Sequence, residues 1–192
     1  MKYDPNKHHR RSIRLKGYDY SWPGAYFVTV CTHNRDCLFG KIANDEMFLN
    51  RFGRIIEEKW NNIPQHFEHI QLDAFQIMPN HFHGILFIVD VVGAKHSGKD
   101  RMFSFQNRHG NASPLPGRPH GTKSGSLSAI MQNYLSITAR KINQSRNTPG
   151  VKLWQRNYHD RIIRNERELN NIRDYIINNP LNWELDKENP KN

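Results

Sequence analysis

Residues 77–86 read IMPNHFHGIL, in which two histidines are separated by one residue and lie between two apolar runs. The apolar and aromatic run over 82–89 predicts a β-strand. Alternate side chains of a strand share a face, so His81 and His83 point the same way while Phe82 points to the other face. Burying an imidazole without a partner is costly. The pair therefore indicates either a divalent metal site, which needs a third ligand, or two hydrogen-bonded structural histidines.

Hydrophobic periodicity predicts the elements on either side of this stretch. Further strands are expected over 25–32, 37–42 and 70–77, the second returning antiparallel to the first. Helices are expected over 45–62, 126–143 and 165–179. Asn165 suits the N-cap of the last helix, and Pro180 ends it. A chain of 192 residues suits one compact domain, taken here as residues 1–192.

The chain is strongly basic, with 28 Lys and Arg against 18 Asp and Glu, a formal net charge of +10 and a pI near 9.8. Such a charge favours polyanionic partners, nucleic acid before anionic membranes. Residues 1–16 are predicted to form a basic arm, and residues 93–124, rich in Gly, Ser, Pro and basic side chains, a flexible basic insertion. The candidate nucleic-acid contacts in the arm are Arg10, Arg11, Arg14 and Lys16.

Several classes of protein are disfavoured. No apolar run approaches the roughly 20 residues that span a bilayer, and the N-terminal segment lacks the apolar core of a signal peptide. Cys31 and Cys37 are the only cysteines, so neither a disulfide framework nor a four-cysteine zinc site is expected. Residues 93–99 match G-x-x-x-x-G-K, but Asp100 replaces the required Ser or Thr. We expect a cytoplasmic protein with no membrane association and no nucleotide cofactor.

Two further stretches could carry chemistry. Tyr175 and Asn179 are one helical turn apart, so their polar groups can reach the same point, although a core-edge tyrosine and a helix-ending asparagine would look alike. Residues 154–161, WQRNYHDR, mix aromatic and basic side chains, which suits stacking on unpaired bases and phosphate contacts. A half-buried loop is an equal alternative. The candidate nucleic-acid contacts here are Trp154, Arg156, Tyr158 and Arg161.

Taken together, these motifs resemble a known family. MPNHFHGIL resembles the HUH signature (histidine, hydrophobic residue, histidine) of single-tyrosine transposases, and IRDYIINNP resembles their nucleophile helix. RRSIRLKGYDYSWPGAYFVTVCT and LWQRNYHDRIIRNERELNNIRDYIINNP are similar to the REP-associated tyrosine transposases in particular. The resemblance implies an α+β fold of the ferredoxin-like HUH endonuclease type, with an antiparallel sheet of four to five strands and helices mainly on one face. The order of the expected elements agrees with it.

The resemblance also implies roles for individual residues. Tyr175 matches the nucleophile, His81 and His83 the paired metal ligands, and Asn179 the third ligand. Imidazole ligands alone would suggest zinc or manganese, whereas the family implies Mg²⁺ or Mn²⁺. The implied activity is that of a metal-dependent single-stranded DNA endonuclease and strand transferase, a transposase forming a 5′-phosphotyrosine on hairpin-bearing repetitive DNA. Arg161 stands where many relatives have histidine, so no role transfers to it.

The expected partner is single-stranded or hairpin DNA, and a homodimer is left open. Two other functions would share features of this sequence. A domesticated, non-catalytic nucleic-acid-binding module would have the same charge and the same aromatic residues. A metal hydrolase acting on a small phosphoester would use the same histidine pair, but it would not need a net charge of +10 or a long basic insertion.

Overall fold

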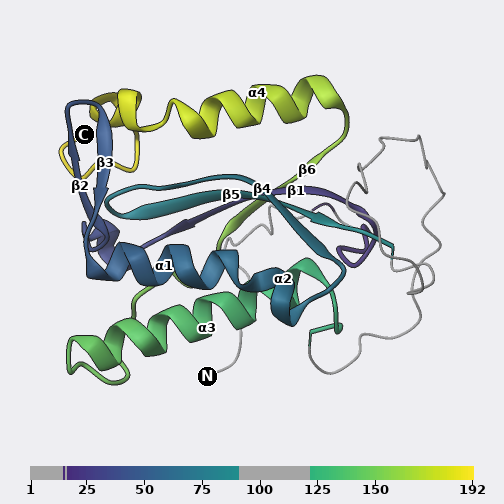
Figure 1. The fold of residues 1–192 in the computed structure, drawn as a ribbon, viewed down its shortest axis with the longest axis horizontal. Coiled ribbons are helices and arrows are strands. Elements are labelled where there is room, and N and C mark those ends of the chain that lie inside the picture. The colour runs from purple at the N-terminus through teal and green to yellow at the C-terminus, as the bar shows by residue number, and fades with distance from the viewer. Residues whose placement is uncertain (1–14, 16, 91–121) are drawn as a thin grey trace, which may run out of the picture.

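The computed structural model describes residue 15 and residues 17–90 and 122–192 (Figure 1). The predicted contacts Arg10, Arg11, Arg14 and Lys16 lie outside the described residues, as does most of the predicted insertion at 93–124. The strands are β1 (Gly24–Cys31), β2 (Gly40–Ala43), β3 (Glu46–Leu49), β4 (Ile70–Ile77), β5 (His81–Ile88) and β6 (His159–Ile163). The α-helices are α1 (Arg51–Asn61), α2 (Ile63–His66), α3 (Leu127–Ser145) and α4 (Glu166–Ile177), and two 3-10 helices are η1 (His33–Arg35) and η2 (Pro180–Leu185).

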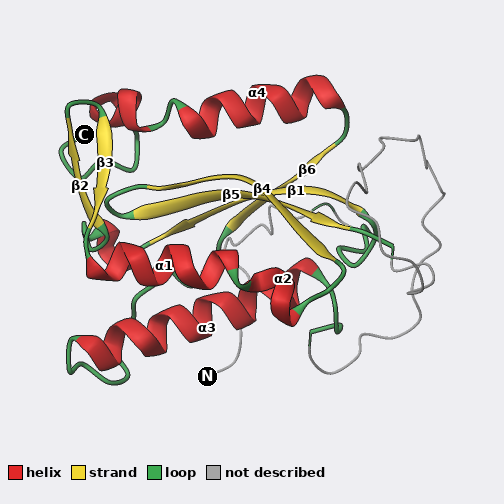
Figure 2. Cartoon of the chain, in the orientation of Figure 1, coloured by secondary structure: helices red, strands yellow, loops and turns green. Residues whose placement is uncertain are grey.

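The centre of the fold is a four-stranded antiparallel sheet in the order β4-β5-β1-β6. Helices α1, α2 and α3 cover one face of the sheet, and α4 covers the other (Figures 1 and 2). The α+β architecture with an antiparallel sheet is therefore as predicted. Strand β5, which carries the histidine pair, lies between β4 and β1, so its residues are shielded on both sides and both faces.

The strand predicted at 37–42 is present as β2 at Gly40–Ala43, but its predicted antiparallel return against the first strand is wrong, as is the predicted start of a helix at Asp45. Strand β2 pairs with β3 in a separate hairpin, and its turn residues Asn44 and Asp45 both have positive φ, as a two-residue turn of type I′ requires. Helix α1 starts only after Asn50, whose side chain accepts hydrogen bonds from the next turn of backbone N–H groups. Short apolar runs fit both helical and strand spacing, which is why Phe48 was assigned to the helix.

Strand β6 was not predicted, because residues 154–161 read as a loop. It pairs antiparallel with β1 and forms one edge of the sheet. Its side chains are mostly exposed or half-buried, and only Ile163 is fully buried. A short edge strand with charged residues has little apolar alternation, so the sequence carries a weak signal for it.

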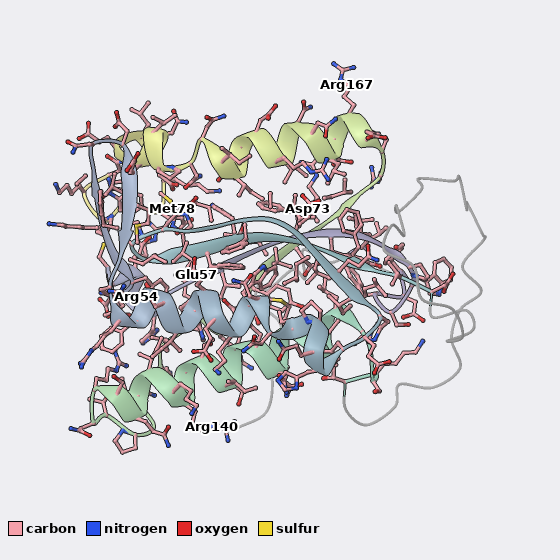
Figure 3. All side chains as sticks on the ribbon, viewed as in Figure 1. Arg54, Glu57, Asp73, Met78, Arg140 and Arg167 are labelled. Atoms are coloured by element: carbon pink, nitrogen blue, oxygen red, sulfur yellow. The ribbon has the colours of Figure 1, made fainter. Side chains whose placement is uncertain are left out.

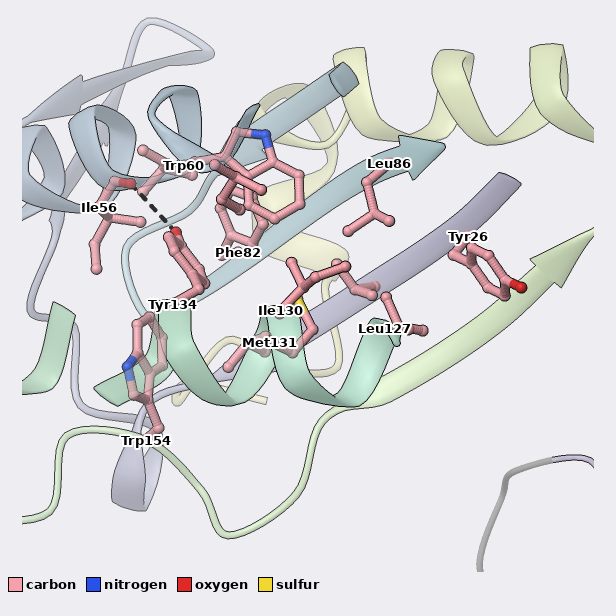
Figure 4. Packing of buried hydrophobic residues seen from close by; sticks show 14 of the residues in the cluster. Tyr26, Ile56, Trp60, Phe82, Leu86, Leu127, Ile130, Met131, Tyr134 and Trp154 are labelled. Atoms are coloured by element: carbon pink, nitrogen blue, oxygen red, sulfur yellow. Dashed lines mark hydrogen bonds between the residues drawn. The ribbon is translucent and has the colours of Figure 1, made fainter. Parts of the chain in front are cut away.

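The larger core lies between the sheet and helices α1 and α3 (Figure 4). Trp60 of α1, Phe82 of β5 and Tyr134 of α3 meet there, with ring centroids between Trp60 and Phe82 4.6 Å apart. The buried Tyr134 hydroxyl donates a hydrogen bond to the carbonyl oxygen of Ile56 (3.2 Å), so the polar atom is satisfied.

A second core lies between the sheet and α4. Ile85 and Phe87 of β5 point to this side, where they meet the stripe of Leu169, Ile172 and Ile176. Since side chains alternate along β5, His81 and His83 share this face. The predicted alternation of β5 is confirmed, and it places the histidines on the side of the sheet that α4 covers.

Gly84 allows Trp60 to approach the backbone of β5. A Cβ atom at this position would lie 2.6 Å from Cζ2 of Trp60 and 2.8 Å from Cζ of Phe82. We expect Gly84→Ala to lower the free energy of unfolding by about 1–3 kcal/mol, because the indole must shift within a filled core. Gly24→Ala in β1 is the control in a urea titration, since its Cβ would meet Tyr26 at an ordinary 3.5 Å. Equal stabilities of the two variants would contradict the packing argument.

Candidate active site

The histidine pair lies at the start of β5, beneath α4. Both side chains are buried, with His81 0% and His83 3% exposed, and their ring centroids are 4.6 Å apart. Strand pairing sets His81 opposite Cys31 and His83 opposite Thr29 of β1. Two imidazoles are therefore held side by side on a rigid central strand, where little backbone movement is available to separate them.

Hydrogen bonds fix the tautomer of His81. The amide nitrogen of Asn80 donates to the backbone carbonyls of Arg35 and Glu188, so its Oδ1 faces His81 Nδ1 at 2.9 Å as an acceptor. Nδ1 must then carry the proton, and Nε2 carries a lone pair. Nε2 is buried and makes no hydrogen bond. An unpaired imidazole nitrogen aimed into a site is the arrangement that metal ligation requires.

His83 connects the pair to Tyr175 of α4. Its Nδ1 lies 2.8 Å from Thr29 Oγ1, and its Nε2 lies 3.3 Å from the Tyr175 hydroxyl. Phe27 stacks on the His83 ring and meets the Tyr175 ring edge-on. Tyr175 is 48% exposed, so its hydroxyl sits at the border between the buried histidines and solvent, where a large substrate can reach it.

Burial shifts the titration of all three groups. It lowers the pKa of His81, and the carboxylates of Asp186 and Glu188 oppose this only in part. It holds the pKa of His83 well below the ordinary value, and His81 adds to the effect. Burial raises the pKa of Tyr175, Asp186 raises it further, and Asn179 lowers it in part. Near neutral pH the imidazoles are therefore neutral, as ligands must be, and the phenol keeps its proton.

Asn179 lies where α4 gives way to η2. Its backbone is still helical, at φ −62° and ψ −39°, so it remains one turn from Tyr175 despite the proline that follows. The side chain is 3% exposed, and Oδ1 is buried without a hydrogen bond of ordinary geometry. Beyond the larger influence of burial, Asn179 raises the pKa of His81 and lowers that of Tyr175. Its amide therefore acts on both groups.

Asp186 was not predicted as a site residue. It follows η2, and its Oδ2 lies 3.7 Å from His81 Nε2. The candidate ligand atoms of His81, His83 and Asp186 all lie within 4.8 Å of one another. Asp186 belongs to an irregular segment with no hydrophobic periodicity, so no sequence pattern relates it to a strand about a hundred residues earlier.

Comparisons with known proteins place this geometry in context. No family model matches the chain. A Haemophilus influenzae protein, itself uncharacterised, is 41% identical over 186 residues, which cover 97% of this chain and 96% of that protein. The chain belongs to the same family as this Haemophilus protein. Such identity over nearly the full length of both means that the two share one domain organisation.

A solved structure of a REP-associated tyrosine transposase bound to a REP hairpin has the same fold. It is similar with a TM-score of 0.53 and 14% identity, over 90% of this chain and 73% of the other. The similarity to REP-associated tyrosine transposases that the motifs predict thus extends to the whole fold, including the antiparallel sheet. Within the described ranges, no helix has the length and apolar character needed to cross a membrane.

The donor set of this transposase-like fold fits a divalent ion. The nitrogens of His81 and His83 are grouped with the carboxylate of Asp186, and the buried amide of Asn179, which acts on His81, adds an oxygen donor. Oxygen donors suit magnesium and manganese, and imidazoles suit manganese and zinc. Two buried atoms without hydrogen bonds, His81 Nε2 and Asn179 Oδ1, are further support, because a buried polar atom left unpaired is costly unless something binds it.

The four nucleic-acid contacts predicted between residues 154 and 161 differ in their exposure to solvent. Trp154 is 8% exposed, packs on Phe39 and donates a hydrogen bond to Thr138 Oγ1 (3.0 Å), so it offers no open face to a base. Tyr158 is half-buried against the same core. Arg156 is exposed, and Arg161 is exposed and paired with Glu168. The stacking prediction for Trp154 does not agree with its burial, which tertiary contacts determine.

Acidification should destabilise the metal-free protein. The pKa values of His81 and His83 are lower in the fold than their ordinary 6.5, so below pH 6.5 the unfolded chain binds more protons and the free energy of unfolding falls. The slope is at most about 1.4 kcal/mol per pH unit for each histidine. Urea titrations in EDTA between pH 5 and 7.5 measure it, with the exposed His66→Ala as control. A flat profile below pH 6.5 would show that the histidines titrate normally.

Proposed function

We propose that this protein is a single-tyrosine DNA endonuclease and strand transferase. It cuts single-stranded, hairpin-bearing DNA with Tyr175 as nucleophile and uses a divalent cation, Mg²⁺ or Mn²⁺. The observation that carries the proposal is the half-exposed Tyr175 hydroxyl, 3.3 Å from Nε2 of a buried, neutral histidine. A purely structural role for Tyr175 would not explain its position beside a cluster that contains two buried polar atoms without hydrogen bonds, His81 Nε2 and Asn179 Oδ1.

The residues that would hold the ion are His81, His83, Asn179 and Asp186. When bound, a divalent ion polarises the scissile phosphate and neutralises the charge that develops on its oxygens. The protein's own residues keep the two imidazoles neutral and correctly oriented. Burial keeps them neutral, and the hydrogen bonds of Asn80 and Thr29 fix their orientation. Such support of ligand orientation is a general feature of metal sites.

Tyr175 supplies the attacking oxygen. Its hydroxyl oxygen forms a bond to phosphorus, the bond from phosphorus to the 3′ oxygen breaks, and the leaving oxygen takes up a proton to become a free 3′-hydroxyl. The phenol must lose its own proton, because its pKa is raised in the fold. His83 Nε2 is an acceptor within hydrogen-bond reach when it is free, and solvent reaches the half-exposed side chain otherwise.

The proposed cleavage keeps the number of phosphodiester bonds unchanged. One phosphodiester is exchanged for another, the 5′-phosphotyrosine, so a 3′-hydroxyl of DNA can attack it and complete strand transfer with no nucleotide hydrolysis. This is consistent with the sequence prediction that no nucleotide cofactor is used. Tyr175 and the histidines belong to one chain, so the proposal does not depend on a homodimer.

Charge supports a DNA partner. The net charge of +10 favours phosphate binding, and the solved transposase with this fold is bound to a REP hairpin. Arg156 and Arg161 are exposed cations on the segment that leads into α4, and we propose them as phosphate contacts, together with the basic arm at 1–16. We propose the cytoplasm as the compartment in which the protein meets this substrate.

The direct test is incubation with end-labelled DNA followed by a denaturing gel. Hairpin-bearing single-stranded oligonucleotides in Mn²⁺ or Mg²⁺ should give a labelled band shifted by the mass of the protein and resistant to boiling in detergent. A plain duplex of the same sequence is the matched substrate control and should give none. Hairpin binding without an adduct in either metal, across a library of hairpins, would overturn cleavage and favour a non-catalytic binding module.

A further inference from the structure

Helix α4 carries the nucleophile, but its apolar contacts with the sheet are not directional. The buried stripe consists of Leu169, Ile172 and Ile176, which meet Ile85 and Phe87 of β5. Branched aliphatic side chains stabilise docking through buried area. They tolerate small rotations and shifts of the helix, and such movements would displace Tyr175. A directional contact is needed to fix the helix.

Near the start of α4, Glu168 pairs with Arg161 of β6. One turn and more further along, close to Tyr175, the directional contact is a two-pronged ion pair between α4 and β4. Arg173 donates from Nε to Asp73 Oδ1 (2.8 Å) and from Nη2 to Asp73 Oδ2 (2.6 Å). Its Nη1 also donates to Asn170 Oδ1, one turn back on α4 (3.0 Å). Two parallel hydrogen bonds between planar groups fix orientation as well as distance. The guanidinium is therefore tied both to the sheet and to its own helix.

The sheet is shaped to present Asp73. The register of β4 against β5 shifts between Leu72 and Phe75, and within this bulge the Ala74 N–H donates to Asp73 Oδ1 (2.7 Å). Figure 3 shows Asp73 on the side of the sheet that faces α4. A bulge adds a residue to an edge strand and redirects a side chain. Here the redirected side chain is the carboxylate that receives Arg173.

The helical positions explain why this pair would control Tyr175. Successive residues of a helix are about 100° apart, so Arg173 and Tyr175 lie on opposite margins of the stripe formed by Ile172 and Ile176. On the β4 side Arg173 holds Asp73, and on the other side Tyr175 meets His83 and Phe27. Rotation of α4 about its axis would have to break the ion pair before it could move the hydroxyl away from His83.

We propose that Asp73 and Arg173 are positioning residues, which set the rotation and axial position of α4 so that the Tyr175 hydroxyl is held beside the histidine pair of the same chain. This inference rests on the proposed function, because it assigns the pair a part in that reaction. Both side chains are partly exposed, 35% for Arg173 and 18% for Asp73, and such pairs add little to global stability. The effect of the pair is therefore on geometry.

The kinetic test uses Asp73→Asn, which keeps the size of the side chain, and Arg173→Gln, which is shorter but still polar; each removes the charged pair. At saturating hairpin DNA and Mn²⁺, the rate constant of adduct formation should fall by about 10- to 100-fold, since a displacement of 1 Å costs that much. The dissociation constant for hairpin should stay within about twofold, because Arg156 and Arg161 precede α4. The dissociation constant for Mn²⁺ should change less than the rate constant, because two of the four proposed ligands, His81 and His83, lie on β5. The double variant should be no slower than the slower single, as expected for one shared interaction.

Two further variants separate positioning from a loss of folded protein. Arg173→Lys retains the charge without the two-pronged geometry and should recover only part of the rate, while Glu58→Gln, which removes an exposed pair with Lys59, should leave the rate unchanged. Wild-type rates in both Asp73→Asn and Arg173→Gln would overturn the proposal. So would a rate loss that matches the loss of folded protein measured by circular dichroism.

Amide hydrogen exchange tests the same inference without any reaction. In the metal-free protein without DNA, Asp73→Asn should speed exchange across residues 166–177, the span of α4, by about tenfold or more and leave β5 unchanged. Unchanged exchange in α4 would contradict the role of the pair even if cleavage were slow. If the wild-type protein forms no adduct with any hairpin, the proposed function fails, while faster exchange would still show that the pair fixes α4.

Discussion

The Tyr175→Phe variant should form no detectable covalent adduct with hairpin DNA, yet it should bind the same DNA and melt at the same temperature as the wild-type protein. This is the expected result, because the change removes only the oxygen that attacks phosphorus. The loss should be about 10³-fold or more in rate, as for other covalent nucleophiles. The lost hydrogen bond to His83 is long, at 3.3 Å, and half-exposed, so stability should hardly change. A denaturing gel, a gel-shift titration and a thermal melt measure the three quantities.

Tyr18→Phe is the matched control for this experiment. It removes a phenol oxygen that lies 3.2 Å from the Tyr26 hydroxyl. Tyr18 precedes β1, whose first residues pair with the Ile88 end of β5, whereas His81 pairs with the last residue of β1. Adduct formation should be unaffected. Peptide mapping of the wild-type adduct should place the DNA on Tyr175, and a label on any other tyrosine would refute its assignment as nucleophile.

Replacement of both histidines, His81→Ala with His83→Ala, should abolish cleavage and metal binding together. The variant loses both nitrogen donors, so calorimetry should detect no Mn²⁺ binding at the candidate site, and adduct formation should fall by about 10³-fold or more. Excess EDTA should reproduce the loss in the wild-type protein. The exposed His66→Ala serves as control and should bind Mn²⁺ normally.

Thermal melts distinguish this from a purely structural role of the histidines. Mn²⁺ should raise the melting temperature of the wild-type protein, because a ligand that binds only the folded state stabilises it, and it should have no effect on the double variant. Full activity of the wild-type protein in excess EDTA, or an equal response of both proteins to Mn²⁺, would contradict the metal site.

The sequence predicted most of the central fold because local chemistry agrees with tertiary structure there. Alternation along β5 gave the correct faces of Phe82 and the histidines, and Asn165 caps α4 as expected. Prediction failed where a local signal was ambiguous or weak. Residues 45–50 have apolar spacing that fits a helix, but the Asn44–Asp45 turn makes a hairpin, and β6 has too few buried residues to be recognised.

The candidate site shows the same division. Two pairs of residues were each expected to share one face of their element: His81 with His83 on a strand, and Tyr175 with Asn179 on a helix. The fold brings both pairs to one place. Asp186 could not be found in this way, because it lies in an irregular segment and reaches the histidines only through tertiary packing. For the same reason the burial of Trp154 was missed, since nothing local distinguishes a core tryptophan from a stacking one.

The distance along the chain between Tyr175 and His83, 92 positions, has a consequence for protein synthesis. Strands β1, β4 and β5 all lie within the first 88 residues, so the sheet segment with both histidines leaves the ribosome well before α4 is made. Domains form as their segments emerge, at about 5–20 residues per second. A nascent chain therefore passes several seconds with both histidines but without Tyr175, the proposed nucleophile. Under the proposed mechanism, such a chain could not cut DNA until the C-terminal helix is released.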